Sequence, residues 1–286
     1  MEWYEALILG IIQGLTEFLP ISSSGHLELA SFILQTQQKE NLTFTIIVHI
    51  ATAVSILFVF RKDIKDIILG LIKLDREKAE FVSKIIISSI PVGVVGILYE
   101  KEVESFFNGN IVLVGSMLLI TSLLLCFTYF KKKDYQKNVS YSDALIIGLS
   151  QALAILPGIS RSGATISTAL LLNVNREKAT KFSFLMVLVP IFGILILKII
   201  SGFSQSGSLS TSSLLSFQYI IGFLSALISG IFACSLMLKI VRESKLIYFS
   251  IYCFIVGSLG ILYGKNSSNE TFFITPIKEI SELKKL

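Results

Sequence analysis

The apolar positions of this chain come in long runs that are separated by short polar segments. Six of these runs are about 19 to 22 residues long, the length that an α-helix needs to cross a bilayer. Runs of this length also argue against burial inside a soluble domain. The pattern therefore predicts six transmembrane helices, over residues 42–60, 81–99, 111–130, 182–201, 217–238 and 246–264.

Two further apolar regions, 6–34 and 144–172, are each interrupted near the middle by proline, glycine and serine. The interruptions read LPISSSGH at 19–26 and LPGISRSG at 156–163. The arms on either side are about 13 to 15 residues long, which is too short to span a membrane. We expect two re-entrant helical hairpins here. The predicted fold class is an all-α polytopic membrane protein, with six transmembrane helices plus two re-entrant helical hairpins.

Composition agrees with this pattern, because 53% of the residues are apolar and only 16% are charged, whereas soluble domains carry about 25% charged residues. Soluble enzymes, nucleic-acid binders and disulfide scaffolds are excluded. No nucleic acid is expected as a partner, because most of the basic residues lie in loops between apolar runs, where topology explains them. The three cysteines lie inside apolar runs without ligand-like spacing.

The basic loops set the expected orientation. Loops 61–80 and 131–141 are rich in lysine and arginine and should be cytoplasmic, while the acidic stretch 100–104 between them should be external. The basic segment 173–181 can be cytoplasmic only if 144–172 returns to the side from which it entered. The second hairpin should therefore open to the cytoplasm and the first hairpin to the outside.

An internal repeat relates the two interrupted regions. A shift of 138 positions lays residues 6–26 on residues 144–164, and the shared residues include glycine, glutamine and serine rather than leucine alone. Each copy then holds one hairpin and three spans, and an odd number of spans turns the second copy upside down. We predict one integral membrane domain over 1–264, with the two broken tips meeting near the midplane. The predicted repeats cover about 6–130 and 144–264, and a polar tail covers 265–286.

Two charged residues, Glu17 and Arg161, fall at the predicted midplane. An ionisable residue there costs about 2.5 to 3.5 kcal/mol on insertion scales, so function or a partner must maintain it. A mutual ion pair that holds the hairpins together is the purely structural interpretation. It leaves the polar residues around the two charges without a role.

Those surrounding residues suggest chemistry on phosphate. Around Arg161, two glycines admit a ligand close to the backbone, hydroxyls add donors, and a helix start presents free N–H groups. Around Glu17, the first tip adds serines and a histidine, which are residue types suited to nucleophilic attack and proton transfer. The predicted phosphate-binding residues are Ser22, Ser24, Ser160, Arg161, Ser162, Gly163 and Thr165.

With these motifs, Gln13 to His26 (QGLTEFLPISSSGH) and Pro157 to Thr165 (PGISRSGAT), the sequence resembles the undecaprenyl-diphosphatase family of bacteria, the bacitracin-resistance family. The resemblance extends from residue 1 to about residue 264. It implies a multi-pass protein of the bacterial inner (cytoplasmic) membrane that removes the terminal phosphate from a C55 polyprenyl diphosphate. The active site would be accessible from the outer face, and the lipid carrier would be recycled for peptidoglycan synthesis.

The resemblance also implies a metal-assisted site. Its catalytic residues would be Glu17, Ser23, His26 and Arg161, and Glu17 would also contact a divalent cation, Mg²⁺ or Ca²⁺. Many members carry glutamate where this chain has Gln13, which can neither carry a proton nor act as a charged ligand. Expected supporting residues are Gln13, His49 and Gln151.

Several alternatives stay open at the level of sequence. Ser23 or a directly activated water could attack phosphorus, and His26 or Glu17 could take the proton. Inverted repeats with broken helices are also a transporter architecture, so a polyprenyl-phosphate transporter or flippase is the alternative function. A type 2 phosphatidic-acid phosphatase lacks support, because its Lys-x6-Arg-Pro block has no counterpart here. A homodimer is possible.

Overall fold

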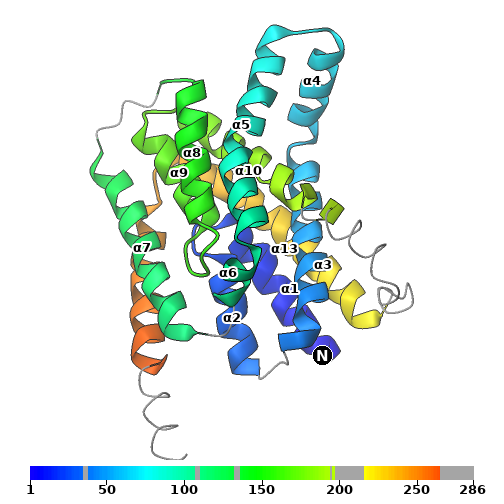
Figure 1. Cartoon of the computed structure of the whole chain (residues 1–286), viewed down its shortest axis with the longest axis vertical. Coiled ribbons are helices and arrows are strands. Elements are labelled where there is room, and N and C mark those ends of the chain that lie inside the picture. The colour runs from blue at the N-terminus through cyan, green and yellow to red at the C-terminus, as the bar shows by residue number, and fades with distance from the viewer. Residues whose placement is uncertain (35–37, 107–109, 132–135, 194, 197–215, 265–286) are drawn as a thin grey trace, which may run out of the picture.

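A computed structural model describes residues 1–34, 38–106, 110–131, 136–193, 195–196 and 216–264 (Figure 1). Within these ranges the chain is helical, and the only extended pairing is a single parallel bridge between Lys137 and Val174. The expectation of an all-helical protein is confirmed. The principal helices are α1 (Trp3–Phe18), α2 (Ser23–Leu34), α3 (Gln38–Val59), α4 (Arg61–Ile72), α5 (Arg76–Leu98), α6 (Glu100–Ser105), α7 (Ile111–Phe130), α8 (Tyr141–Leu153), α9 (Arg161–Leu171), α10 (Arg176–Met186) and α13 (Phe217–Arg242).

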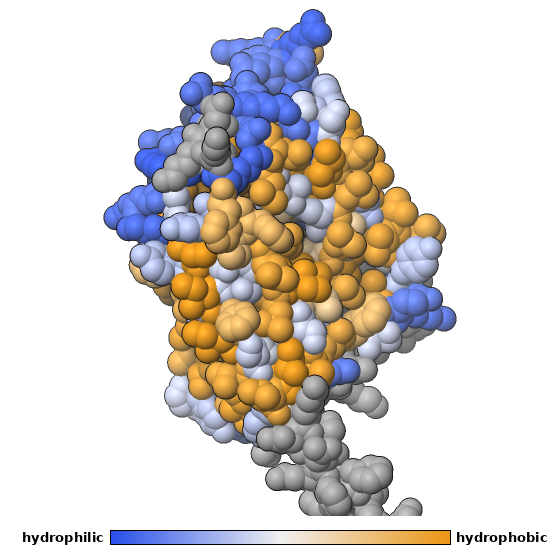
Figure 2. All heavy atoms as spheres, turned by 90° about the vertical axis from the view of Figure 1, so that its left-hand side faces the viewer, coloured by the Kyte–Doolittle hydropathy of each residue, from blue (hydrophilic) through white to orange (hydrophobic). Residues whose placement is uncertain are grey.

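Four helices in the described ranges are long and apolar enough to cross a membrane: α5, α7, α13 and the last helix, Ile247–Gly264. They match four predicted spans to within about five residues at each end. Large apolar side chains stay exposed on these helices, and Figure 2 shows a broad hydrophobic surface on one face, below a hydrophilic end. Because apolar surface of this extent on spans of this length is stable only in lipid, the molecule is an integral membrane protein.

The first predicted span, 42–60, is the apolar part of α3, but the chain does not enter a loop after it. Helix α4 follows at once, and the two helices meet at an angle of 75°. The expectation that 61–80 is a loop was therefore wrong over α4. Its polar positions follow a helical period, with apolar residues interspersed among the charges, so a basic surface helix forms instead.

The predicted span 182–201 is divided in the structure. Helix α10 begins earlier, at Arg176, where the Asn175 side chain caps it, and ends at Met186. Helical backbone resumes at 188–193. The rest of the prediction, from residue 197 onward, lies outside the described residues, as does the polar tail 265–286.

Both interrupted regions fold as two short helices around a bend. Helices α1 and α2 make the first pair, and α8 and α9 make the second. Proline cannot continue a helix, and Leu19 before Pro20 is accordingly extended, so α1 ends at Phe18. None of these helices exceeds 16 residues. Each is therefore too short to cross a bilayer alone.

Two pairs of packed helices are equivalent under the 138-residue shift. Helix α1 lies against α13, and α8 lies against α5 (Figure 1). Small residues permit both approaches: a Cβ on Gly10 would lie 2.6 Å from the Gly222 carbonyl oxygen, and one on Gly148 would lie 2.3 Å from that of Ser88. Each short hairpin therefore packs against a long helix of the other predicted repeat.

Candidate active site

The two hairpin tips touch each other. A Cβ on Gly25 would lie 3.2 Å from the Gly158 Cα, and one on Gly163 would lie 3.3 Å from the Pro20 Cβ. These two contacts are equivalent, because the 138-residue shift carries one pair onto the other. The residues that the sequence places at separate tips therefore surround one point of the fold.

Serine fixes the backbone of both tips. Ser22 Oγ accepts hydrogen bonds from the N–H of Gly25 at 3.3 Å and from that of Gly158 at 3.1 Å. In the second tip, Ser160 Oγ accepts from the N–H of Gly163 at 3.1 Å and caps α9. Each hydroxyl thus satisfies an N–H group that the helix leaves free at its start.

Thr121 of α7 secures the second tip. Its hydroxyl donates to the Gly158 carbonyl at 3.0 Å and accepts from the Ser160 N–H at 2.9 Å. Gly158 itself has φ +102°, and an added Cβ would lie 2.4 Å from the Val114 carbonyl oxygen. Only glycine fits this turn without strain.

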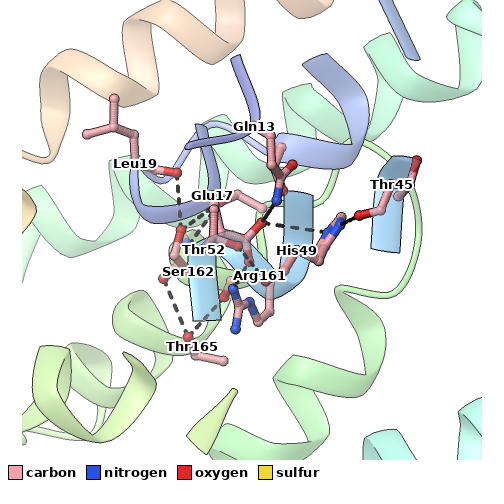
Figure 3. A network of polar contacts seen from close by, with 12 residues as sticks. Gln13, Glu17, Leu19, Thr45, His49, Thr52, Arg161, Ser162 and Thr165 are labelled. Carbon is pink, nitrogen blue, oxygen red and sulfur yellow. Dashed lines mark hydrogen bonds and ion pairs between the residues drawn. The ribbon is translucent and has the colours of Figure 1, made fainter. Parts of the chain in front are cut away.

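The Glu17 carboxylate is the centre of the polar network (Figure 3). Its Oε2 accepts a hydrogen bond from Ser23 Oγ at 2.6 Å and one from Gln13 Nε2 at 3.0 Å. Its Oε1 pairs with Nη2 of Arg161. The carboxylate is buried, so this set of donors offsets much of its desolvation. Three polar side chains, contributed by both hairpins, thus meet at one carboxylate.

Arg161 has bonding capacity left over. One guanidinium nitrogen is paired with Glu17, but Nη1 is buried with no hydrogen-bond partner in the described part of the chain. Leaving a buried donor unsatisfied costs about 1 to 3 kcal/mol, and more for a charged group. The Glu17–Arg161 ion pair considered from the sequence does form. An unused charged donor beside it is what an incoming oxyanion would require.

His49 of α3 also faces Glu17. Its Nε2 lies 3.9 Å from Glu17 Oε2, while its Nδ1 lies 2.7 Å from the Thr45 carbonyl oxygen (Figure 3). Because a carbonyl can only accept, Nδ1 carries the hydrogen and Nε2 of the neutral ring is an acceptor. His49 therefore lies beside the carboxylate, and its supporting role stays a prediction.

His26 lies outside this network. Its Nδ1 is 2.8 Å from the Ser22 carbonyl oxygen, and its Nε2 is 2.8 Å from the Tyr252 hydroxyl. Ser23, one turn earlier on α2, bonds to Glu17 instead. The geometry therefore joins Ser23 to the carboxylate rather than to the imidazole.

The predicted phosphate-binding hydroxyls are engaged within the tips. Ser162 Oγ donates to the Leu19 carbonyl at 3.1 Å and lies 3.2 Å from Ser160 Oγ. Thr165 Oγ1 donates to the Arg161 carbonyl at 2.9 Å. Ser24 Oγ lies 3.3 Å from Ser22 Oγ. The Ser162–Leu19 bond joins the two tips, and the other contacts lie within one tip. The role of these hydroxyls toward phosphate stays a prediction.

Gln151 is not part of the Glu17 network. Both of its side-chain polar atoms are buried without hydrogen-bond partners in the described ranges. Its repeat partner Gln13 donates to Glu17 and leaves only its Oε1 unpartnered. The two equivalent glutamines therefore have different surroundings.

A metal ion would find few protein ligands here. No group of three or more histidine, cysteine or acidic residues suited to a metal exists among the residues that the structure describes. Hard oxygen donors are nevertheless present in the Glu17 carboxylate and in Gln13 Oε1, which is buried and unpartnered. Mg²⁺ commonly uses one or two carboxylates, with substrate phosphates and water completing its coordination. The donor set fits a cation that binds together with a phosphorylated substrate.

Sequence reasoning missed the residues that hold this site from neighbouring helices. Thr121 contacts a tip and Tyr252 contacts His26 through their hydroxyls, whereas Thr45 contacts His49 through its backbone carbonyl, which any residue could supply. Thr121 and Tyr252 lie inside predicted spans as polar residues among apolar ones. Only that polarity could have singled them out, and many helical threonines merely bond to their own backbone.

Comparison with known proteins identifies the family. The family model described as bacitracin resistance protein BacA matches residues 6–259. The chain belongs to this family. A curated undecaprenyl-diphosphatase of Bacteroides fragilis is 50% identical over 92% of this chain and 98% of its own length. A relative of the same name in Christiangramia forsetii is 51% identical over the same shares, and one in Korarchaeum cryptofilum is 41% identical over 90% and 97%. The BacA match covers both tips and all the site residues named above.

Proposed function

We propose that this chain hydrolyses undecaprenyl diphosphate to undecaprenyl phosphate and inorganic phosphate. This reaction would recycle the lipid carrier for peptidoglycan synthesis and give resistance to bacitracin. Family membership and the printed names of the relatives support it. The observation that carries it is the Ser23–Glu17–Arg161 arrangement, in which a hydroxyl, a carboxylate and an unsatisfied guanidinium donor meet at the tips.

In the proposed reaction, Ser23 Oγ attacks the terminal phosphorus and its proton passes to Glu17. A bond from Oγ to phosphorus forms, and the bond from phosphorus to the bridging oxygen breaks, so undecaprenyl phosphate leaves with the electron pair. Water then hydrolyses the phosphoserine and releases inorganic phosphate. Among the two proton acceptors considered for Ser23, the 2.6 Å contact favours Glu17 over His26.

Arg161 would bind the phosphoryl oxygens through Nη1 and, as the substrate arrives, transfer part of its interaction from Glu17 to the substrate. The 2.6 Å Ser23 contact would then lead to proton transfer. A directly activated water is the alternative nucleophile.

A divalent cation, Mg²⁺ or Ca²⁺, is part of the proposal. Glu17 and Gln13 Oε1 would hold it, with the remaining positions filled by phosphate oxygens and water. When bound, it would neutralise charge on the transferring phosphoryl group.

The finer topology is also a proposal. We infer six transmembrane helices and two re-entrant hairpins in an inverted-topology repeat within one membrane domain. The equivalent helix pairs and the equivalent tip contacts support this inference. We also propose that the protein lies in the cytoplasmic membrane with its site open to the outer face, and the basic loops support this orientation. A homodimer is compatible with this arrangement, and light scattering in detergent would test it.

The decisive experiment is phosphate release from C55 polyprenyl diphosphate by the purified protein in detergent, with and without a chelator. We expect release that stops on chelation and returns with Mg²⁺ or Ca²⁺. A protein that releases no phosphate in either condition, yet moves polyprenyl phosphate across reconstituted vesicles, would be the transporter instead. Activity that chelation leaves unchanged would remove the cation from the proposal.

A further inference from the structure

His26 is held by Tyr252, a residue of the last helix to which the proposed reaction gives no role. Tyr252 lies within Ile247–Gly264, 226 positions away in sequence, and its hydroxyl is 2.8 Å from His26 Nε2. The two rings are nearly parallel, with an interplanar angle of 15° and centroids 5.7 Å apart. The imidazole is therefore fixed in both position and plane.

The hydrogen bonds decide which nitrogen of His26 carries the proton. The Ser22 carbonyl can only accept, so Nδ1 is the protonated nitrogen and Nε2 of the neutral ring has the free electron pair. The Tyr252 hydroxyl then donates to Nε2. After proton uptake at Nε2, the same hydroxyl oxygen can accept, because a phenol is both donor and acceptor. The contact is compatible with both protonation states.

The repeat supplies a second observation. The 138-residue shift carries His26 onto Ala164 and Val114 onto Tyr252. Val114 belongs to α7, which packs against α9 of the second tip, just as Tyr252 of the last helix contacts α2 of the first. Where one tip has an imidazole, the opposing helix has a hydroxyl. Where the other tip has alanine, the opposing helix has valine. The first of these equivalent pairs, His26 and Tyr252, is therefore polar at both positions, and the second, Ala164 and Val114, is apolar at both.

We propose that Tyr252 is a positioning residue for His26, which keeps the imidazole oriented with Nε2 as its basic atom. This proposal rests on the function proposed above and on a proton-transfer role for His26 in it. Because Glu17 already contacts Ser23, the oriented imidazole is left to activate the water that hydrolyses the phosphoserine. In that step Nε2 takes the water proton, and the Tyr252 hydroxyl gives up its hydrogen bond to Nε2 as the proton arrives. Tyr252 acts through His26 and does not touch the phosphorus.

The test is Tyr252→Phe, which removes one oxygen and keeps the ring. We expect kcat for phosphate release to fall about tenfold with KM changed less than about twofold, since general acid–base catalysis contributes about 10² to 10⁴ and only orientation is lost. Tyr248→Phe is the matched control. Tyr248 lies one turn away on the same helix with 65% of its surface exposed, and its variant should keep wild-type kcat.

Nitrogen-15 spectra of histidine-labelled protein supply a readout that a purely structural role would not move. His49→Asn leaves a single histidine and assigns the His26 signals. In Tyr252→Phe we expect the Nε2 signal to move toward that of a nitrogen without a hydrogen bond, while the Nδ1 signal stays in place. Unchanged Nε2 and unchanged kcat would overturn the proposal. A fall in activity and melting temperature with unchanged Nε2 would also overturn it, in favour of simple packing.

The same design separates this proposal from the proposed function. If the wild-type protein releases no phosphate, the enzymatic proposal fails, whereas the spectra still report whether Tyr252 holds His26. If the wild type is active and Tyr252→Phe matches it, only the positioning role fails.

Discussion

The two hairpin tips have the same pattern of backbone hydrogen bonds but carry different functional side chains. In both, a serine accepts from the glycine N–H three residues later, and a second serine hydroxyl lies close to the first, at 3.3 Å in one tip and 3.2 Å in the other. In both, that glycine lies against the opposite tip. The serine cap is common to both tips because the glycine N–H groups that it satisfies are buried and need a hydrogen-bond partner.

The differences are confined to side chains around that plan. Position 23 is serine and its equivalent 161 is arginine, while Glu17 and His26 are equivalent to Ile155 and Ala164. One tip therefore supplies the carboxylate and hydroxyl, and the other supplies the cation. Two copies of a neutral tip could bind an anion, but a reaction needs a nucleophile and a base on one side of it. Divergence of equivalent positions produced that asymmetry.

The largest effect should come from removing the guanidinium group of Arg161, the positive charge of the second tip. Arg161→Ala should lower phosphate release by about a thousandfold, because one preorganised donor to a developing oxyanion is worth about 10² to 10³ and the charge is lost as well. Arg76→Ala is the control, since that side chain is 93% exposed and lies at the start of α5, away from the two tips (Figure 1).

Folding has to be separated from catalysis in that experiment. Arg161→Ala leaves Glu17 buried without its counterion, which is expected to destabilise the fold. The double variant with Glu17→Gln removes both charges and should recover the melting temperature but not the activity. If Arg161→Ala alone kept its turnover within tenfold of wild type, that result would contradict the role of Arg161 in binding the phosphoryl group.

Ser23→Ala should have the next largest effect, a loss of about 10² to 10³ in kcat, because it removes the hydroxyl that contacts Glu17. Ser24→Ala, at the next position, should cost less, since within the part of the chain that the structure describes the Ser24 hydroxyl contacts the Ser22 hydroxyl and not Glu17. Rapid-quench trapping with labelled substrate should show phosphate on the wild-type serine. An active enzyme without any covalent adduct would favour direct attack by water.

Most of the helices and the two interrupted hairpins could be predicted from the sequence, because long apolar runs, their interruptions and repeated Gly, Gln and Ser positions are local patterns. It correctly placed Glu17, Ser23 and Arg161 at meeting tips. It could not place His26 against Tyr252, because that contact joins residues that have no shared motif and depends on how the last helix packs. Helix α4 was missed for a related reason: charge suggested a loop, while spacing of the apolar residues allowed a helix.

A smaller effect, on stability rather than activity, should separate the two tip glycines. Gly158→Ala places a Cβ 2.4 Å from a carbonyl oxygen at φ +102° and should cost about 2 to 3 kcal/mol of unfolding free energy. Gly25→Ala meets its nearest neighbour at 3.1 Å without a positive φ and should cost about 1 kcal/mol. Melting temperatures in detergent measure both, and equal shifts would show that the tips tolerate side chains alike.

The smallest effect should distinguish the equivalent glutamines. Gln151→Leu removes a buried amide with no hydrogen-bond partner in the described structure, so it should leave phosphate release unchanged and raise the unfolding free energy by about 1 kcal/mol. Gln13→Leu removes a donor to Glu17 and should lower kcat several-fold. Thermal melts and phosphate release of the two variants, measured side by side, check this. Equal losses of activity would mean that Gln151 also has a functional role. A buried amide without a protein partner is maintained only where a ligand or water completes its hydrogen bonds.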